Sequence, residues 1–267
     1  DYSLQQGRVF QYDTASNIEY TGDQNSVIDS SIIQATKNLR HPNSSHDLFR
    51  TAIWKTMCDD LIQSGNFSYR KRIILVPVAA NGTDFASWSP GEVRYRTTVT
   101  ATNDVLSDPW NYLAAFMWNQ GERSCVAYDI DYKAKFNAMI TRFQADISRF
   151  NANLPIIFAE VAGNHYDQYI DPDGIYMKQF INAKYAELAA ENSNMYLVKT
   201  LGKYDLTSDN KHYTSASYRS LGHEYYNGFC ELTGLPPFKE DKKSIVINTK
   251  NDIRSVGINH ELYLKPS

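Results

Sequence analysis

The sequence lacks the features of a membrane protein, a nucleic-acid-binding protein or a disulfide-rich protein. None of its apolar runs approaches the roughly 20 residues of a membrane span. A net charge of −3 over 267 residues offers no basic surface for phosphates. Residues 1–4 lack the basic and apolar regions of a signal peptide, which is uninformative because a mature or excised chain would lack them too. No partner among membranes or nucleic acids is therefore indicated.

Cysteine is also scarce. The three cysteines, Cys58, Cys125 and Cys230, are odd in number and widely spaced, so we expect buried thiols and no disulfide framework. No cluster of histidine, cysteine and aspartate has the spacing of metal ligands. The sequence therefore implies neither a metal nor a cofactor.

Alternating apolar strands and amphipathic helices predict an α/β fold. With 42% hydrophobic residues the chain can bury the core of one large domain. The patterns predict strands at 7–13, 72–80, 111–118, 156–161 and 195–198, and helices at 49–61, 136–147, 175–191 and from 214 or 215 to 230. This alternation favours a three-layer α/β/α sandwich with a central parallel sheet. Residues 14–45 are polar and turn-rich, and we expect a long surface loop there.

Asp209 and His212 lie three residues apart just before the last helix. An acid so placed can accept the Nδ1 proton of the imidazole and leave Nε2 free to take a proton from a nucleophile. The spacing alone is weak evidence, since an acid three residues before a histidine arises often by chance. Its position ahead of a capped helix start, with Thr214 or Ser215 as the cap, makes it a candidate acid–base pair.

Polar residues follow three of the predicted strands. In open parallel sheets the loops past the carboxyl ends of strands hold the ligand, so Gly82 can present a backbone N–H to a reacting oxygen, although it can also be an ordinary turn glycine. Gln120 can donate to an oxyanion, and Glu122 can hold that amide or its loop in place. Trp88 can line a pocket or simply pack, and His165 is a candidate by position only.

Three of these stretches resemble conserved blocks of a known family. Residues 78–83 look like the second block of the SGNH (GDSL-like) hydrolases. Residues 118–122, Trp-Asn-Gln-Gly-Glu, resemble the third block of their sialate O-acetylesterase-type branch. Asp209, His212 and the following Tyr-Thr-Ser resemble the last block, and the order and spacing of all three match over residues 8–232.

The resemblance implies a serine esterase that removes acetyl groups from a sugar. By this carry-over His212 is the general base and Asp209 orients it. The backbone at Gly82 and the side chain of Gln120 line the oxyanion hole, with Glu122 as a support. The substrate partner implied is an acetylated carbohydrate.

The sequence departs from the family pattern in two places. Asn81, a candidate supporting or substrate-binding residue, stands where the family usually has glycine. The first block, a strand ending in Gly-Gln-Ser-Asn or Gly-Asp-Ser, is not found before Gly7. Ser3 is the only serine ahead of the first predicted strand and is therefore a candidate nucleophile, but it lacks the strand and glycine that precede such a serine. We therefore favour a nucleophile upstream of this chain, with a separate fragment or another chain completing the sheet.

The composition changes after residue 233. We expect an esterase domain at 1–233 and a C-terminal β extension, or the start of a following module, at 234–267, with strands at 244–248 and 258–264. Such an arrangement suits a piece of a larger secreted or virus-borne protein, such as a phage tail-spike esterase, and hence an extracellular or virion-associated location. The competing interpretation is a carbohydrate-binding or structural module that keeps the fold without turnover.

Overall fold

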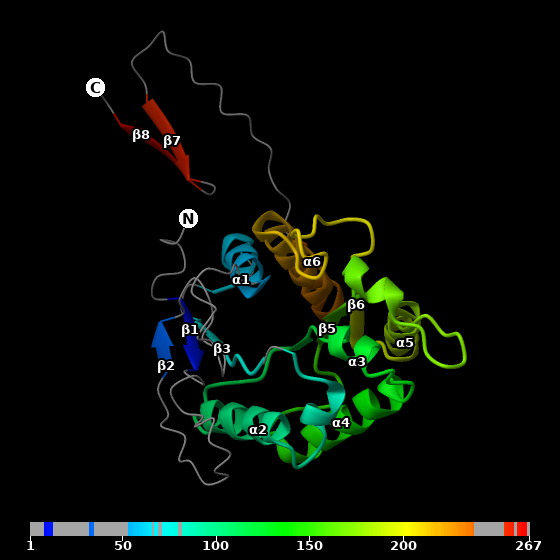
Figure 1. The fold of residues 1–267 in the computed structure, drawn as a ribbon. Coiled ribbons are helices and arrows are strands. Elements are labelled where there is room, and N and C mark those ends of the chain that lie inside the picture. Colours follow the sequence, from blue (N-terminus) through cyan, green and yellow to red (C-terminus); the bar gives the residue numbers. More distant parts are fainter. Residues whose placement is uncertain are drawn as a thin grey trace.

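Helices cover both sides of short parallel strands, as Figure 1 shows. The structure is a computed structural model that describes residues 8–12, 32–34, 53–65, 67–68, 71–79, 82–237, 254–258 and 261–265. In Figure 1, α1 (Ile53–Gln63) and α6 (Ser215–Thr233) lie above the strands, and α2 (Val93–Leu106) and α4 (Tyr132–Asp146) lie below them. The α/β/α fold class predicted from the sequence is therefore confirmed.

Six of the described strands form two sheets of three. The first, in the order β2-β1-β3, contains β1 (Val9–Tyr12), β2 (Ile32–Gln34) and β3 (Ile73–Leu75); β1 is parallel to β3 and antiparallel to β2. The second, in the order β4-β5-β6, is wholly parallel and contains β4 (Phe116–Trp118), β5 (Ile156–Ala159) and β6 (Met195–Val198). The connections carry η3 (Phe85–Trp88), α3 (Glu122–Val126), η4 (Asn164–Gln168) and α5 (Met177–Glu191).

The strand β5 shows how the sequence builds three layers. Its four residues are all buried and belong to two different apolar cores. Ile156 and Phe158 join the core formed with α4 and α5, whereas Ile157 and Ala159 join the core formed with α1 and α6. Because side chains alternate along a strand, a strand covered on both faces needs such an unbroken apolar run.

Two predicted strands are shorter than the sequence suggests. The apolar runs at 72–80 and 111–118 contain only the three residues of β3 and the three of β4. Each pairs with one neighbour among the described residues, β1 for β3 and β5 for β4. A run that forms hydrogen bonds on one side has fewer partners to hold it in a ladder, and Pro77 removes a backbone donor just after β3.

The helix α2 has no counterpart in the predictions. Its buried face carries Thr97, Thr98 and Thr102, and β-branched residues have low helix propensity. The hydroxyl of Thr97 donates to the carbonyl of Val93, and that of Thr98 donates to the carbonyl of Arg94, both at 2.8 Å. These bonds satisfy the buried hydroxyls within the helix, so tertiary packing overrides the local preference.

Two other segments differ from expectation. The predicted loop at 14–45 contains β2, which pairs with β1 through the register Phe10 to Gln34. The C-terminal hairpin joins β7 (Arg254–Ile258) to the antiparallel β8 (Glu261–Lys265), so its first strand lies ten residues later than predicted, and residues 244–248 lie outside the described residues. The helix α6 ends at Thr233, where Gly234 has a left-handed φ of 70°. The domain boundary at this point stays a prediction.

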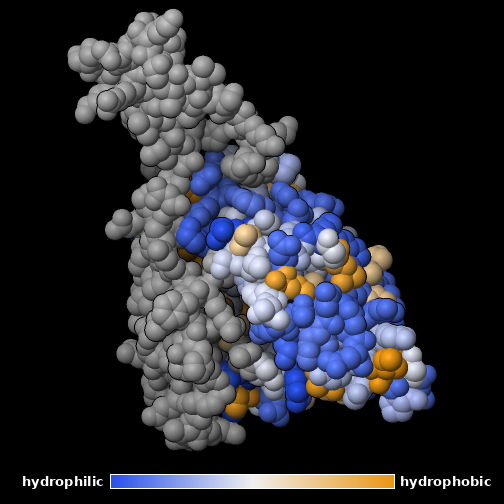
Figure 2. Space-filling view, turned by 45° about the horizontal axis from the view of Figure 1, so that its top comes forward, coloured by the Kyte–Doolittle hydropathy of each residue, from blue (hydrophilic) through white to orange (hydrophobic). Residues whose placement is uncertain are grey.

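The described residues on the face shown in Figure 2 are mostly hydrophilic, with apolar residues in small scattered groups. Among the described residues, the most exposed large apolar side chain is that of Trp110, at 90%. None of the described helices combines the length and apolar character needed to cross a bilayer. Scattered apolar residues of this kind are usual on a protein surface.

Candidate active site

Asp209 and His212 form a hydrogen-bonded pair on the loop between β6 and α6. Oδ2 of Asp209 lies 2.6 Å from Nδ1 of His212. Oδ1 of Asp209 accepts hydrogen bonds from the Thr207 hydroxyl at 2.6 Å and from the backbone N–H groups of Lys211 and His212 at 2.8 and 3.1 Å. The structure thus brings together the two residues that the sequence spacing singled out.

These hydrogen bonds determine which nitrogen of the His212 imidazole carries the proton. The Thr207 hydroxyl, the Lys211 backbone N–H and the His212 ring hold the pKa of Asp209 well below its ordinary value. A carboxylate can only accept, so Nδ1 of His212 must be the donor. Nε2 of the neutral ring then carries a lone pair and can accept a proton.

Backbone geometry holds this loop in place. Asn210, between the acid and the histidine, has a left-handed φ of 55°, which asparagine tolerates better than most residues. The N–H of Thr207 donates to the carbonyl of His212 at 2.8 Å and closes the turn. Thr214, one of the two predicted capping residues, accepts from the N–H of Ser217 at 3.2 Å and begins α6.

Gln120 follows β4, and buried side chains orient its amide. The hydroxyl of Tyr132 donates to Oε1 of Gln120 at 2.9 Å. Nε2 then points the other way and donates to Oγ of Ser124 at 3.1 Å and to the carbonyl of Thr83 at 3.4 Å. The longer bond is at the limit for an N–H donor. A ligand oxygen can therefore replace the Thr83 carbonyl as the acceptor of this N–H.

Gly121 makes the turn from β4 into α3. Its φ is 132°, and a Cβ placed there would lie 2.5 Å from Cγ2 of Val161 and 3.2 Å from Cγ2 of Ile181. No other residue has both the conformation and the space. This is why glycine separates Gln120 from Glu122 in the motif.

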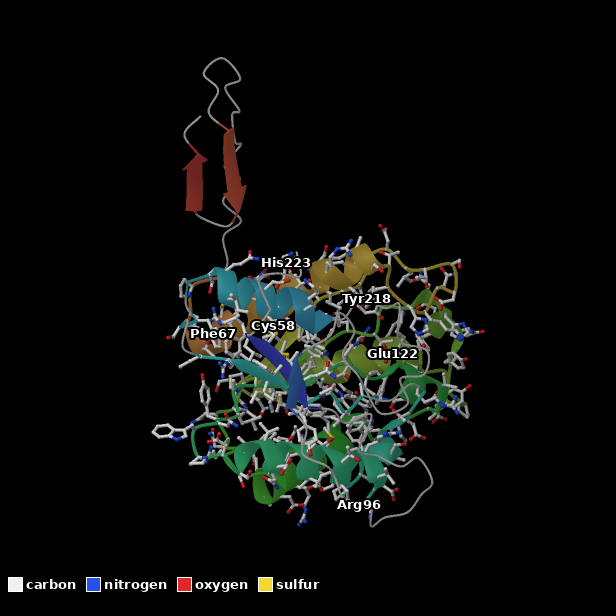
Figure 3. All side chains as sticks on the ribbon, turned by 90° about the vertical axis from the view of Figure 1, so that its left-hand side faces the viewer. Cys58, Phe67, Arg96, Glu122, Tyr218 and His223 are labelled. Carbon is white, nitrogen blue, oxygen red and sulfur yellow. The ribbon has the colours of Figure 1, made fainter. Side chains whose placement is uncertain are left out.

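Glu122 begins α3 and is labelled in Figure 3. Burial raises the pKa of Glu122 above its ordinary value, opposed in part by its own backbone N–H and by the charge of His212. By solvent accessibility Glu122 is half-buried in the first turn of α3, and its charge interacts favourably with that of His212.

Gly82 lies on the loop after β3 and next to Gln120, because the carbonyl that Gln120 contacts belongs to Thr83. Its φ is 69°, and no atom lies within 4 Å of where a Cβ would be. Within the described part of the chain its N–H has no hydrogen-bond partner. The neighbouring Asn81 lies outside the described residues, so its predicted role stays untested.

Trp88 and His165 have different surroundings. Trp88 is only 5% exposed and packs edge-on against Trp118, with 5.0 Å between ring centroids, so the structure favours the packing alternative over a pocket wall. His165 is half-buried on η4, and its backbone N–H donates to the carbonyl of Asn210 at 3.0 Å. The loop of His165 therefore borders the loop of the acid–base pair.

No described residue forms a hydrogen bond with Nε2 of His212, and Ser3 lies outside the described residues. The cysteines are free and buried as predicted, and burial raises the pKa of Cys58 and Cys125 to about 12, so these thiols are unreactive. No three His, Cys, Asp or Glu side chains in this part of the chain group as metal ligands would.

Some residues of the site carried no signal in the sequence. The hydroxyl of Thr207 donates a hydrogen bond to Asp209. Tyr132, which lies in α4 twelve residues after Gln120, donates to the side chain of Gln120 and orients it. The hydroxyl of Tyr185 donates to the backbone carbonyl of Gln120 at 2.5 Å. Their spacing matches no short motif, so only the folded arrangement identifies them.

A known protein family matches most of this chain. Residues 58–231 match the carbohydrate esterase family of sialic acid-specific acetylesterases. The chain belongs to this family. Membership in this carbohydrate esterase family assigns it to the hydrolases that act on ester bonds, and the matched range includes Gly82, Gln120, Asp209 and His212.

Two solved structures resemble the chain in fold. A protein from Arabidopsis thaliana is 19% identical with a TM-score of 0.55, over 83% of this chain and 79% of that chain. A carbohydrate acetylesterase from Xanthomonas citri is 14% identical with a TM-score of 0.57, over 86% of this chain and 51% of that chain, so this chain spans about half its length. At these identities the likeness shows the fold alone. No curated protein matches the chain. A phage tail-spike origin and an extracellular or virion-associated location stay predictions.

Proposed function

We propose that this carbohydrate esterase removes acetyl groups from a sugar by a serine–histidine–aspartate mechanism. The observation that carries the proposal is the Asp209–His212 pair, in which Nδ1 is bonded at 2.6 Å and Nε2 has no hydrogen-bond partner among the described residues. The acetyl ester is supported by the family and by the acetylesterase activity in the name of the Xanthomonas citri protein.

In the first half of the reaction a serine attacks the acetyl carbonyl. Its hydroxyl proton passes to Nε2 of His212 as the new C–O bond forms, and Asp209 stabilises the imidazolium. The tetrahedral intermediate collapses when the sugar oxygen leaves and takes the proton from Nε2. This leaves an acetyl-serine.

In the second half, water attacks the acetyl-serine. His212 accepts a proton from the water and returns it to the serine oxygen, which releases acetate. The atoms balance as one ester and one water giving one alcohol and one acetic acid.

The negative oxygen of each intermediate needs preorganised donors. The N–H of Gly82 lacks a partner among the described residues, and Nε2 of Gln120 holds Thr83 by a long bond of 3.4 Å. Gly82 lies on the loop after β3 and Gln120 on the loop after β4, and Tyr132 prevents the Gln120 amide from turning over. Fixed donors cost no reorganisation when charge develops.

The neighbouring loop suits a sugar. Tyr166 and Tyr169 are half-buried on and beside η4, and their rings contact His165. Aromatic faces present apolar surface and hydroxyl tips together, a combination that a sugar ring can use.

The test is His212→Ala in the form of the protein that carries the serine. Removing the base should lower kcat on p-nitrophenyl acetate by roughly 10³-fold or more with little change in KM. His223→Ala is a matched control, because His223 also bonds an aspartate, Asp60, at 2.5 Å but joins α6 to α1. Equal kcat values for the His212→Ala enzyme and the wild type, with unchanged circular dichroism, would refute the assignment.

A second candidate function is a carbohydrate-binding module without turnover. It is favoured by the lack of a nucleophile at Nε2 of His212 among the described residues. Two measurements distinguish the two functions: labelling of the protein by a fluorophosphonate probe and release of acetate from the substrate. Labelling of a serine together with acetate release supports the esterase, whereas sugar binding with neither supports the module.

A further inference from the structure

Two aromatic side chains extend into solvent from one short turn that precedes β4. Trp110 is 90% exposed and Tyr112 is 60% exposed. A single exposed aromatic residue needs no explanation, because much of any protein surface is apolar. Two of them on one turn can form a surface on which a ligand stacks, provided that the turn holds them in place before the ligand binds.

Hydrogen bonds fix this turn from several sides. Oδ1 of Asp108 accepts from the backbone N–H of Trp110 at 2.9 Å, and the carbonyl of Asp108 accepts from the N–H of Asn111 at 3.1 Å. The side chain of Asn111 donates to the carbonyl of Val105, near the end of α2, at 2.9 Å. The guanidinium of Arg149, which follows α4, donates to the carbonyl of Asn111. The turn that carries the two aromatic rings is therefore anchored to two parts of the fold.

Lysine and arginine side chains lie beside these rings. Nζ of Lys71 lies 5.2 Å from the centre of the Tyr112 ring and 3.4 Å from its hydroxyl oxygen. Arg149 contacts the carbonyl in the middle of the turn. Arg8 donates to the carbonyl of Lys71 at 3.3 Å, and its guanidinium lies 5.2 Å from the ring centre of Phe67, which Figure 3 labels at the margin of the molecule. Three cations thus gather near two exposed aromatic rings.

Within the described part of the chain, none of these three cations pairs with a carboxylate. Lys71, Arg8 and Arg149 take part in none of the ion pairs found there. The one carboxylate in the turn itself, that of Asp108, is bonded through Oδ1 to the backbone of the turn. Since the cations outnumber this carboxylate, the surface complements a negatively charged ligand. The net charge of −3 is a total over the whole chain and does not show this local excess.

This surface and the candidate active site lie at opposite ends of β3 and β4. Lys71 precedes β3 and Tyr112 precedes β4, whereas Gly82 follows β3 and Gln120 follows β4. An extended chain spans at most about 3.5 Å per residue, so Tyr112 and Gln120 lie within about 28 Å of one another. A ligand on this surface is therefore outside the catalytic site, but a long polymer can contact both.

We propose that this aromatic–cationic surface binds a polysaccharide that carries carboxylate groups. The surface consists of Trp110, Tyr112, Lys71, Arg149 and Arg8. Its aromatic rings stack against sugar rings, and its cations pair with the carboxylates. A glycan is favoured over other polyanions because the chain belongs to a carbohydrate esterase family. By holding one segment of the polymer, the surface raises the concentration of neighbouring segments at the catalytic end of the strands.

Equilibrium binding of the protein to immobilised polysaccharides tests the proposal. The acidic probes are polygalacturonate and polysialic acid, which present two different carboxylate-bearing sugars. Fully methyl-esterified polygalacturonate is the comparison, because it has the same backbone without the charge. We expect binding to at least one acidic polymer and none to the methyl ester. Raising the salt concentration from about 50 to about 500 mM should weaken this binding on the order of tenfold, since salt screens exposed charges.

Trp110→Ala and Lys71→Ala test the two kinds of contact. Each should weaken binding to the acidic polymer by about tenfold, as truncation of an anchoring side chain at an interface usually does. Tyr176→Ala and Lys203→Ala are the matched controls, because Tyr176 is 49% exposed, Lys203 is exposed, and both lie on other loops. Both controls should stay within about twofold of wild type. Circular dichroism of the four variants checks that they are folded.

Five results would overturn the proposal. Absence of binding to both acidic polymers would show that the surface holds no such glycan. Binding that Trp110→Ala and Lys71→Ala both retain would show that the glycan binds elsewhere. Equal binding to the methyl ester would identify a neutral glycan as the ligand, and equal binding to single-stranded oligothymidylate would identify a nucleic acid. Self-association of the wild type that Trp110→Ala abolishes would make a second copy of the chain the occupant.

Turnover of p-nitrophenyl acetate by the serine-bearing form separates this surface from the catalytic site. Trp110→Ala should keep the wild-type kcat and KM on this small ester, which is too short to reach the surface. A lower kcat in Trp110→Ala would contradict a separate surface. The binding itself does not rest on the proposed serine mechanism. A wild-type protein that hydrolyses no ester, yet binds the acidic polymer through Trp110 and Lys71, would refute that mechanism and support the surface.

Discussion

Replacing Asp209 by asparagine tests whether the carboxylate sets the tautomer of His212. Three donors converge on Oδ1 of Asp209, from Thr207, Lys211 and the His212 backbone. An asparagine must therefore place its carbonyl oxygen at the position of Oδ1. Its NH₂ group then takes the position of Oδ2, which now lies 2.6 Å from Nδ1 of His212. Nδ1 then becomes an acceptor, the ring proton moves to Nε2, and the base is lost.

The expected loss of kcat depends on how far the Asp209–His212 pair is exposed to water. The same inversion in a buried triad lowers kcat by about 10⁴-fold. Here the side chains of His212 and Asp209 are 40% and 43% exposed, so water screens the interaction, and we expect a loss of about 10³-fold in kcat with KM little changed.

Steady-state hydrolysis of p-nitrophenyl acetate by the serine-bearing form measures the loss. Asp205→Asn is the matched control, because Asp205 is exposed on the same loop and its carboxylate forms no hydrogen bond with a described residue. We expect its kcat to stay within about twofold of wild type, as for surface substitutions generally. If Asp209→Asn keeps more than about a tenth of the wild-type kcat, the carboxylate does not control the tautomer.

Two further predictions concern the motif after β4. Gln120→Ala should lower kcat by roughly 10²–10³-fold with KM unchanged, because an oxyanion donor acts on charge present only in the transition state; a change in KM alone would make Gln120 a substrate-binding residue. Gly121→Ala should reduce the free energy of unfolding by about 3 kcal/mol, since its Cβ would lie 2.5 Å from Val161 at a φ of 132°. Gly82→Ala, which has left-handed φ but open space, is the control and should cost about 1 kcal/mol in urea denaturation; equal losses for the two would contradict the steric argument.

Local sequence predicted the parts of the fold that are buried on both faces. The strand at 195–198 was placed without error, although β6 pairs with β5 alone among the described strands. The run from 156 covers all of β5, which has a strand on each side and an apolar core on each face. The strands at 72–80 and 111–118 were overestimated. Their apolar residues indicate a central position in a sheet, whereas β3 and β4 have three residues each and, among the described strands, pair on one side only.

In the candidate site too, local sequence predicted some residues and missed others. Asp209 and His212 could be found because both lie on one short loop, where the distance along the chain fixes the distance in space. The groups that orient Gln120 could not, because Tyr132 and Tyr185 lie on separate helices and reach it only in the folded chain. Sequence reasoning therefore finds the proton-transfer pair but not the side chains that hold the oxyanion donor.

Glu122 links stability to activity, and its substitution by glutamine separates the two. Burial raises its pKa, so the unfolded chain loses this proton at a lower pH than the folded chain does. As the pH rises from the unfolded-state pKa towards the raised folded-state pKa, ionisation increasingly favours unfolding. Glu122→Gln removes the ionisation, so it should raise the free energy of unfolding at pH 7 more than at pH 4.

The same change should weaken catalysis. The charge of Glu122 interacts favourably with that of His212, and the imidazole becomes fully charged only when it holds the proton of the nucleophile. Losing this interaction should lower kcat by about tenfold, which corresponds to roughly 1.4 kcal/mol of barrier. Urea denaturation at the two pH values and steady-state kinetics test both halves. A variant that is no more stable at pH 7, or whose gain is equal at pH 4, would show that the Glu122 carboxyl is not desolvated; a variant that is stabilised at pH 7 with unchanged kcat would show that its charge does not act on the base.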